Sequence, residues 1–368
     1  MRVLYGVCGE GMGHATRSAV VGAHLERRGH QVTYASGPGR ALDHLQARSG
    51  RPVLRVLGPA WWMHGNRINP ALTALSNVFR IGAGTVANIP ALLQAEKLRP
   101  DVVISDFDYW SGWASHRLGV PLLAVDSVHF LTRCTHDPAL LRDEDRHAAA
   151  ITLPIVRLVV PGARRYLVTS FADAPIVGEN TTLHRPILRD EIFVERLRRL
   201  ATGDWRSKYA VAYFFEGADH ERMALALGAM GMPVRVYGKA GLCGEQQCGN
   251  VTFCPTSAEG FARDLASCAA VVGSTYTLMS EAIFLGKPML AVPFGGQYEM
   301  ALNASYLERL GYGMRAPAGE LTAETVSDFA GRLGEFEEAL GGRPPHDGNA
   351  ELLASVEGAM RGVTGLAA

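Results

Sequence analysis

The sequence lacks the features that mark nucleic-acid-binding, membrane-spanning and secreted proteins. Its 36 Lys and Arg residues are balanced by 36 Asp and Glu residues, so it has no basic field that would attract nucleic acid. The longest apolar stretch, residues 148–160, contains Pro154 and Arg157 and is too short to span a bilayer. The first residues show no signal-peptide pattern. We therefore expect a cytoplasmic protein without a nucleic-acid partner.

Cysteine is also scarce. Six cysteines occur among 368 residues, and in a cytoplasmic chain they are expected to be reduced thiols. Cys243, Cys248 and Cys254 lie close together in the sequence, but their spacing matches no common zinc site, so no metal is expected. The remaining composition, 48% hydrophobic and 20% charged, is that of a globular protein and excludes disorder. The length suggests about two domains.

Two stretches of the chain alternate short apolar segments with helical patterns. In the first we expect strands at residues 3–7, 31–36, 52–57, 101–106 and 121–125, and helices at 15–28 and 109–118. In the second we expect strands at 210–215, 233–237, 251–254, 269–272 and 288–292, and helices at 221–230 and 277–285. This order predicts an α/β protein of two Rossmann-like domains, whose parallel sheets face a central ligand cleft.

The domain boundaries follow from composition. Residues 171–207 are rich in Pro, polar residues and Arg and show no sustained strand, and residues 58–95 are irregular. We therefore expect an N-terminal domain at residues 1–190 and a C-terminal domain at 208–345. A last helix, near 350–360 with Asn349 as its N-cap, lies in a segment (about 346–368) that is a candidate to pack back on the N-terminal domain.

A glycine-rich loop follows the first predicted strand. It reads Gly9-Glu10-Gly11-Met12-Gly13-His14, and glycines here let the backbone approach a ligand closely. The spacing is not that of a dinucleotide-binding loop, and the Gly-Lys-Ser/Thr of a phosphate-binding P-loop is missing. His14 would lie at a helix N-terminus beside the cleft, where a neutral imidazole could act as a general base. The alternative is a capping or packed histidine.

Two aspartates follow the predicted strand at residues 101–106. Strand ends face the ligand crevice of an α/β sheet, so a carboxylate here could orient His14. Either aspartate could instead cap the helix that begins at Tyr109. We expect Asp106 to be the partner of His14 and Asp108 to be the cap, and we also place Asp108 among the acceptor-side candidates.

Small and hydroxyl-bearing residues lead into a helix of the second domain. The amides of residues 274–278 lie at a helix N-terminus with a partial charge of roughly +0.5 and could hold a diphosphate, with the Ser274 and Thr277 hydroxyls as further donors. Glu281, one turn further on, could accept two ribose hydroxyls, or could simply complement the helix dipole.

A second polar loop follows the next strand. Gln297 and Glu299 come directly after Pro293-Phe294-Gly295-Gly296, and both suit the recognition of sugar hydroxyls. The alternative is a polar first turn of a helix, with Glu299 near its positive end.

In this combination the chain resembles the GT-B nucleotide-sugar glycosyltransferases, especially the MurG-like and UDP-glycosyltransferase-related group, over about residues 1–330. The residues that carry the resemblance are Gly11-Met12-Gly13-His14-Ala15-Thr16-Arg17, Ser274-Thr275, Glu281, Gly286-Lys287-Pro288, Pro293 to Gln297 and Asn303-Ala304. The resemblance implies a GT-B fold, His14 as the acceptor-side base and Asp106 as its orienting partner. The donor side that it implies comprises Gly11, Gly13, Ser274, Thr275, Tyr276, Thr277, Glu281, Gln297 and Glu299.

The activity implied by this resemblance is inverting transfer of a sugar from a nucleoside-diphosphate sugar to a hydroxyl of a small-molecule or lipid acceptor, with no metal and no cofactor. Trp61, Trp62 and His64 lie in the irregular insert and are acceptor-side candidates, although the tryptophans could equally be core residues. Because some relatives act on lipid-linked acceptors, peripheral membrane contact is considered, but no basic amphipathic segment marks it.

Two positions depart from the pattern of these relatives. Thr275 stands where they usually have Gly, and Met300 stands where they often have Gln. The second change removes an expected contact to a sugar hydroxyl and is compatible with a deoxygenated donor sugar or with an inactive protein. Two alternatives stay open. One is a nucleotide-sugar 2-epimerase, and the Gly-His loop argues against it. The other is a non-catalytic nucleotide-sugar-binding protein, and His14 and Glu281 argue against it.

Overall fold

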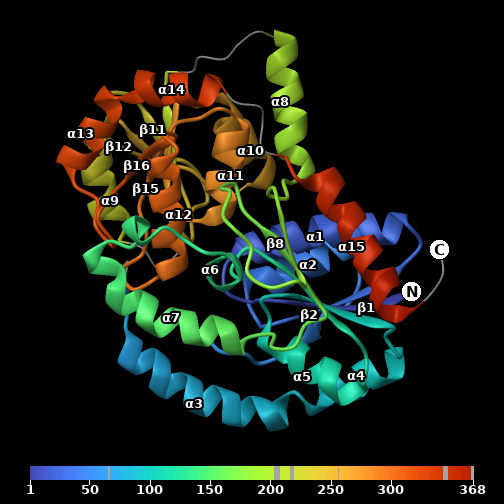
Figure 1. The fold of residues 1–368 in the computed structure, drawn as a ribbon. Coiled ribbons are helices and arrows are strands. Elements are labelled where there is room, and N and C mark those ends of the chain that lie inside the picture. Colours follow the sequence, from blue (N-terminus) through green and yellow to red (C-terminus); the bar gives the residue numbers. More distant parts are fainter. Residues whose placement is uncertain (65–66, 203–207, 216–218, 256, 343–346, 366–368) are drawn as a thin grey trace.

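The computed structural model describes residues 1–64, 67–202, 208–215, 219–255, 257–342 and 347–365. These residues form two α/β units, each built around one sheet (Figure 1). The central strands of both sheets are apolar and buried, which is typical of parallel sheets with helices on both faces.

Seven strands, counted over the described residues, form the first sheet, which is parallel throughout. In spatial order they are β3 (Leu54–Arg55), β2 (Gln31–Ser36), β1 (Arg2–Val7), β6 (Val102–Asp106), β7 (Leu122–Asp126), β8 (Arg165–Thr169) and β9 (Thr181–His184). The helices of this unit are α1 (Met12–Arg27), α2 (Arg40–Ser49), α3 (Pro70–Ala87), α4 (Ile89–Leu98), α5 (Tyr109–Leu118), α6 (Phe130–Arg133), α7 (Arg146–Leu158) and the C-terminal α15 (Asn349–Thr364). Helix α15 belongs here because Leu352 and Val356 share a buried core with Val3 of β1.

The second sheet also has seven strands within the described ranges, and all but its edge strand β12 are parallel. In spatial order they are β12 (Gln246–Cys248), β13 (Val251–Phe253), β11 (Val234–Tyr237), β10 (Ala210–Tyr213), β14 (Ala270–Gly273), β15 (Met289–Ala291) and β16 (Gly313–Arg315). Its helices are α8 (Asp190–Thr202), α9 (His220–Leu227), α10 (Ala258–Ser267), α11 (Tyr276–Phe284), α12 (Tyr298–Arg309), α13 (Ala323–Gly331) and α14 (Leu333–Gly341). Helix α8 packs against α10 of this unit.

Two expectations about the chain's organisation are wrong. The segment 171–207 does contain a strand, β9, but the short Thr-Thr-Leu-His sequence at this sheet edge has no apolar run that would signal it. Residues 58–95 are not irregular, because they contain α3, part of α4 and a small antiparallel pair, β4 (Met63–His64) and β5 (Arg67–Ile68). The helical period of α3 is obscured because apolar residues such as Val78 and Phe79 lie on its exposed face.

The chain crosses between the two units twice, and Asn349 joins the two crossings. Asn349 is the first residue of α15 and not its N-cap, which is Gly348. Its side chain instead accepts a hydrogen bond from the Leu188 N–H (2.8 Å) and donates one to the Leu188 carbonyl (2.7 Å). A Cβ at Gly348 would lie 2.0 Å from the Arg185 carbonyl oxygen, so the close approach of the two segments requires glycine.

The two units also contact each other at the carboxyl ends of their sheets. The first turns of α1 and α11 approach so closely that a Cβ at Gly13 would lie 2.6 Å from Thr277 Oγ1. At a second point, the Ile68 N–H donates to the Gly295 carbonyl (2.8 Å). The loops that follow β1 and β6 therefore lie opposite the loops that follow β14 and β15, and the candidate site residues lie between them.

Candidate active site

His14 and Asp106 form a hydrogen-bonded pair at the carboxyl end of the first sheet. His14 lies in the first turn of α1, and Asp106 is the last residue of the adjacent strand β6. His14 Nδ1 is 2.7 Å from Asp106 Oδ1. Nδ1 also lies 2.7 Å from Arg17 Nη2. In the tautomer that donates from Nδ1 to the carboxylate, which can only accept, Nε2 is the nitrogen that can take up another proton. The imidazole is partly exposed while Asp106 is fully buried, so the expected pairing of these two residues is confirmed.

Arg17 is a central member of this site whose role the sequence did not reveal. It lies one turn after His14 and donates from Nε to Asp106 Oδ2 (2.7 Å) and from Nη2 to Oδ1 (2.6 Å). Ser18 Oγ donates to the same carboxylate (2.9 Å). Burial by itself would raise the pKa of Asp106, but the charge of Arg17 and the hydrogen bonds outweigh burial and hold that pKa below its ordinary value. Asp106 is therefore an ionised, rigidly oriented support for His14.

Asp108 caps α5, as the sequence predicts. Its carboxylate accepts hydrogen bonds from the Ser111 N–H (2.8 Å) and the Ser111 hydroxyl (2.6 Å). Phe107 between the two aspartates has a φ of 51°, a left-handed conformation that is costly for a residue with a side chain. This turn directs the Asp106 carboxylate toward His14 and the Asp108 carboxylate toward α5. Because Asp108 is buried and occupied by Ser111, the geometry favours capping over the acceptor contact also considered for it.

The capping role of Asp108 predicts a pH-dependent stability. Burial raises the pKa of Asp108 from 3.8 to about 6. Below about pH 4 the group is protonated in both the folded and the unfolded state. As the pH rises to about 6, Asp108 ionises freely only in the unfolded state. The free energy of unfolding therefore falls by at most about 3 kcal/mol by pH 7. Asp108→Asn keeps an acceptor oxygen but cannot ionise, so its unfolding free energy relative to the wild type should increase between pH 4 and pH 7 in urea denaturation. Parallel pH profiles of the two proteins would contradict this account.

The loop before α11 differs in detail from the expected donor site. Thr275 is the N-cap of α11, with Oγ1 accepting from the Leu278 N–H (3.4 Å). Ser274 was expected to donate to a phosphate, but its buried hydroxyl donates to the Val292 carbonyl (2.6 Å) and ties the loop to the next strand end. Thr277, which faces Gly13, is the hydroxyl placed where the two units meet. The helix N-terminus thus keeps its backbone amides as the main anion-binding groups.

Tyr276 is placed in the core, which argues against the donor contact expected for it. Its ring stacks on Phe171 of the first unit, with centroids 6.0 Å apart and an interplanar angle of 18°. Burial raises the pKa of its hydroxyl to about 12. Tyr276 therefore packs the two units together.

Glu281 lies on α11 and is paired with an arginine that the sequence did not suggest. Arg189 Nε is 2.7 Å from Glu281 Oε1, and Arg189 Nη2 is 2.9 Å from Oε2. Both side chains are largely buried. The carboxylate expected to accept ribose hydroxyls is thus present on the correct helix, but both of its oxygens accept hydrogen bonds from Arg189.

Gln297 and Glu299 lie at the start of α12, opposite the His14 site. Gln297 is the half-buried N-cap residue, and Glu299 is in the first turn. Ser127 Oγ accepts from Arg17 Nη1 (3.1 Å) and donates to Glu299 Oε1 (3.3 Å). A chain of contacts therefore runs from Glu299 in the second unit through Ser127 and Arg17 to the Asp106–His14 pair. Burial between the two units raises the pKa of Glu299.

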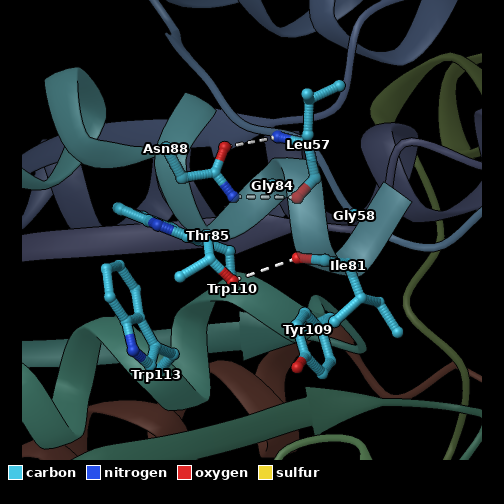
Figure 2. A pocket seen from close by; sticks show the side chains of 9 residues that line it. All are labelled: Leu57, Gly58, Ile81, Gly84, Thr85, Asn88, Tyr109, Trp110 and Trp113. Atoms are coloured by element: carbon cyan, nitrogen blue, oxygen red, sulfur yellow. Dashed lines mark hydrogen bonds between the residues drawn. The ribbon is translucent and has the colours of Figure 1, made fainter. Parts of the chain in front are cut away.

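A hollow lined in part by aromatic residues lies between α3 and α5 (Figure 2). Its empty space, open solvent included, is about 370 Å³. Figure 2 shows Tyr109 and Trp113 of α5 on one side and Gly84 and Thr85 of α3 on the other. The other lining residues are Leu57, Gly58, Ile81, Asn88 and Trp110. Helix α5 begins three residues after Asp106, and its first residue, Tyr109, lines the hollow.

The two tryptophans expected on the acceptor side lie outside this hollow. Trp61 is half-buried and Trp62 is exposed, and neither lines the hollow. The backbone of His64 is in β4, but its side chain lies outside the described part of the structure. Sequence reasoning overlooked Tyr109 and Trp113, although their position directly after Asp106 could have identified them.

The described residues form neither a metal-binding cluster nor a membrane-spanning helix. They contain no group of three or more His, Cys, Asp or Glu side chains that could hold a metal ion. Among the described helices, none is long and apolar enough to cross a bilayer.

Solved structures with the same architecture define the class of this protein. CalG4, the calicheamicin glycosyltransferase, superposes with a TM-score of 0.62 over 98% of each chain, at 18% sequence identity. VinC, a glycosyltransferase solved in complex with dTDP, gives a TM-score of 0.61 over 99% of this chain and 100% of its own, at 17% identity. SnogD of Streptomyces nogalater gives 0.57 over 98% of this chain and 99% of its own, at 17% identity. The two facing α/β units are therefore a GT-B fold.

The sequence itself assigns the family. Residues 1–334 match the family model described as glycosyl transferase family 1, and the chain belongs to this family. An uncharacterized glycosyltransferase of Methanosarcina acetivorans is 35% identical over 118 residues, which is 30% of this chain. The chain spans only 28% of the length of that relative.

Proposed function

We propose that this protein transfers a sugar from a nucleoside-diphosphate sugar to an acceptor hydroxyl with inversion at the anomeric carbon, and that His14 is the general base. The observation that carries the proposal is the His14–Asp106 pair, which lies opposite the N-terminus of α11 across the contact between Gly13 and Thr277. A base and an anion-binding helix end are thus held on the two sides of one boundary. Family membership and the dTDP complex of VinC support a nucleotide donor.

In this mechanism the acceptor hydroxyl lies next to His14 Nε2. The nitrogen takes the hydroxyl proton while the oxygen forms a bond to the anomeric carbon, and the bond from that carbon to the diphosphate oxygen breaks. Asp106 holds the imidazole in the required tautomer and stabilises the imidazolium that forms. Holding both substrates between the two units makes the reaction effectively unimolecular.

The departing diphosphate carries the negative charge that develops in the transition state. The backbone amides at the N-terminus of α11, after the Thr275 cap, and the Gly11 to Gly13 loop at the start of α1 provide donors on both sides of the boundary. Preorganised donors of this kind stabilise developing charge without reorganisation. These groups allow the reaction to proceed without a metal ion.

The acceptor is proposed to enter the hollow between α3 and α5 (Figure 2). Tyr109 and Trp113 offer apolar, aromatic surface there, and the lining has no charged side chain. A small molecule with a flat apolar portion would fit such a surface, with its reacting hydroxyl directed toward His14.

A donor screen tests this function. The protein should be heated with UDP-, dTDP- and GDP-sugars, and at least one should raise the melting temperature because ligands that bind only the folded state stabilise it. Mass spectrometry of mixtures with candidate acceptors should then show a product heavier by one sugar. Conversion of the donor without an acceptor would instead identify a 2-epimerase, and binding without turnover or hydrolysis would identify a non-catalytic binding protein.

A further inference from the structure

The buried pair of Arg189 and Glu281 places a cation on the group that should receive the donor ribose. Arg189 donates two parallel hydrogen bonds, one to each carboxylate oxygen, at 2.7 and 2.9 Å. Such forked pairs are among the strongest polar contacts in proteins. A ribose diol that binds a carboxylate in the usual way donates to the same two oxygens, so the guanidinium and the diol compete for one acceptor.

The burial of the two side chains indicates which of them faces the ligand. The Glu281 side chain is 3% exposed and that of Arg189 is 12% exposed. Glu281 is thus the deeper of the two, and Arg189 is the more exposed partner. The guanidinium carbon also lies 5.6 Å from the centre of the Phe261 ring on α10. Because Arg189 occupies both carboxylate oxygens of Glu281, a ribose diol can bind that carboxylate only by displacing the guanidinium.

Arg189 comes from the crossing between the two units and not from the unit that carries Glu281. The preceding residue, Leu188, is held at both its N–H and its carbonyl by the Asn349 side chain. The following helix α8 packs against α10. The backbone on both sides of Arg189 is therefore held in place, and the side chain is the part that can move away from Glu281.

We propose that Arg189 is a latch on the ribose subsite, which must release Glu281 before a nucleotide donor binds and which thereby sets the affinity for the nucleoside part of the donor. This inference rests on the proposed function, because it takes Glu281 as the ribose ligand. The apparent dissociation constant of a nucleotide equals the intrinsic one divided by the fraction of time for which the latch is open. A latch closed about nine-tenths of the time raises it about tenfold.

The test is calorimetric titration of the full-length protein with UDP, GDP, ADP, CDP and dTDP, each beside the analogue that lacks its ribose hydroxyls. In Arg189→Gln the dissociation constant of the nucleotide that binds should fall about tenfold. The dissociation constant of its hydroxyl-free analogue should not change, because that analogue does not use Glu281. Arg189→Lys keeps a charge beside Glu281 but loses the fork, so it should give an intermediate gain and preserves the test if Arg189→Gln fails to fold.

Arg196→Gln is the matched control. Arg196 lies on α8, donates to the Phe284 carbonyl at the end of α11 and does not bond Glu281, so its loss should leave nucleotide affinity unchanged. Weaker binding of the nucleotide and its analogue in Arg189→Gln would overturn the latch and make Arg189 a phosphate ligand. Unchanged binding would overturn it as well. A separate result, nucleotide affinity that is unaffected by Glu281→Gln or absent in every variant, would reject the proposed donor site itself.

Discussion

Replacing His14 with alanine is expected to lower kcat for sugar transfer by about 10²- to 10⁴-fold, the usual contribution of a general base. The physical reason is that His14 Nε2 is the nitrogen left free to take a proton, since Nδ1 is engaged by Asp106 at 2.7 Å. The donor nucleotide does not depend on this nitrogen. Its dissociation constant, measured by titration, should therefore stay at the wild-type value while turnover is lost.

His24 provides the matched control for this variant. It lies on the same helix α1, nearly three turns after His14, and its Nε2 is hydrogen-bonded to Glu357 of α15 at 2.7 Å. His24→Ala should keep the wild-type kcat even if it lowers stability. Wild-type turnover in His14→Ala would falsify the assignment of the base.

Asp106→Asn is expected to damage both stability and activity. The Asp106 carboxylate accepts hydrogen bonds from His14, Arg17 and Ser18 and is the buried counter-charge of Arg17. An asparagine leaves the Arg17 guanidinium without that charge, and loss of one partner of a buried pair costs about 3–5 kcal/mol. Turnover should fall about as far as in His14→Ala, because the amide no longer selects the tautomer with the proton on Nδ1. Urea denaturation and steady-state kinetics measure the two effects.

Ser18→Ala separates these effects from a general loss of hydrogen bonding. Ser18 donates one hydrogen bond from an uncharged hydroxyl to the same carboxylate (2.9 Å), so its removal should cost about 1.5–3 kcal/mol and leave the Arg17 pair in place. If Asp106→Asn were no more destabilising than Ser18→Ala, the ion pair would not be a main support of the site.

The proposed base and the proposed donor side are connected across the two units. Glu299 reaches Ser127, Ser127 reaches Arg17, and Arg17 binds the carboxylate that orients His14. Since Glu299 comes from the second unit and the other members come from the first, this chain of contacts forms only when the units are together. Contact between the two units thus accompanies the hydrogen-bonded arrangement that orients His14.

The sequence by itself determined the fold class and the pairing of His14 with Asp106. Buried parallel strands leave near-continuous apolar runs, and the strands at 31–36 and 101–106 were located from those runs to within one residue. The same regularity located His14 and Asp106, because the carboxyl ends of adjacent parallel strands, β1 and β6, meet at one sheet edge. Helix capping by Asp108 could be predicted from its position alone.

The partners of the site residues were decided only by the tertiary structure. The local sequence does not indicate that the Ser274 hydroxyl donates to the Val292 carbonyl, or that Tyr276 stacks on Phe171 of the other unit. The pairing of Glu281 with Arg189 joins residues 92 positions apart, and that of Arg17 with Asp106 spans 89. Such contacts depend on how whole units pack, and the apolar periodicity that reveals helices and strands carries no information about which polar side chains then meet.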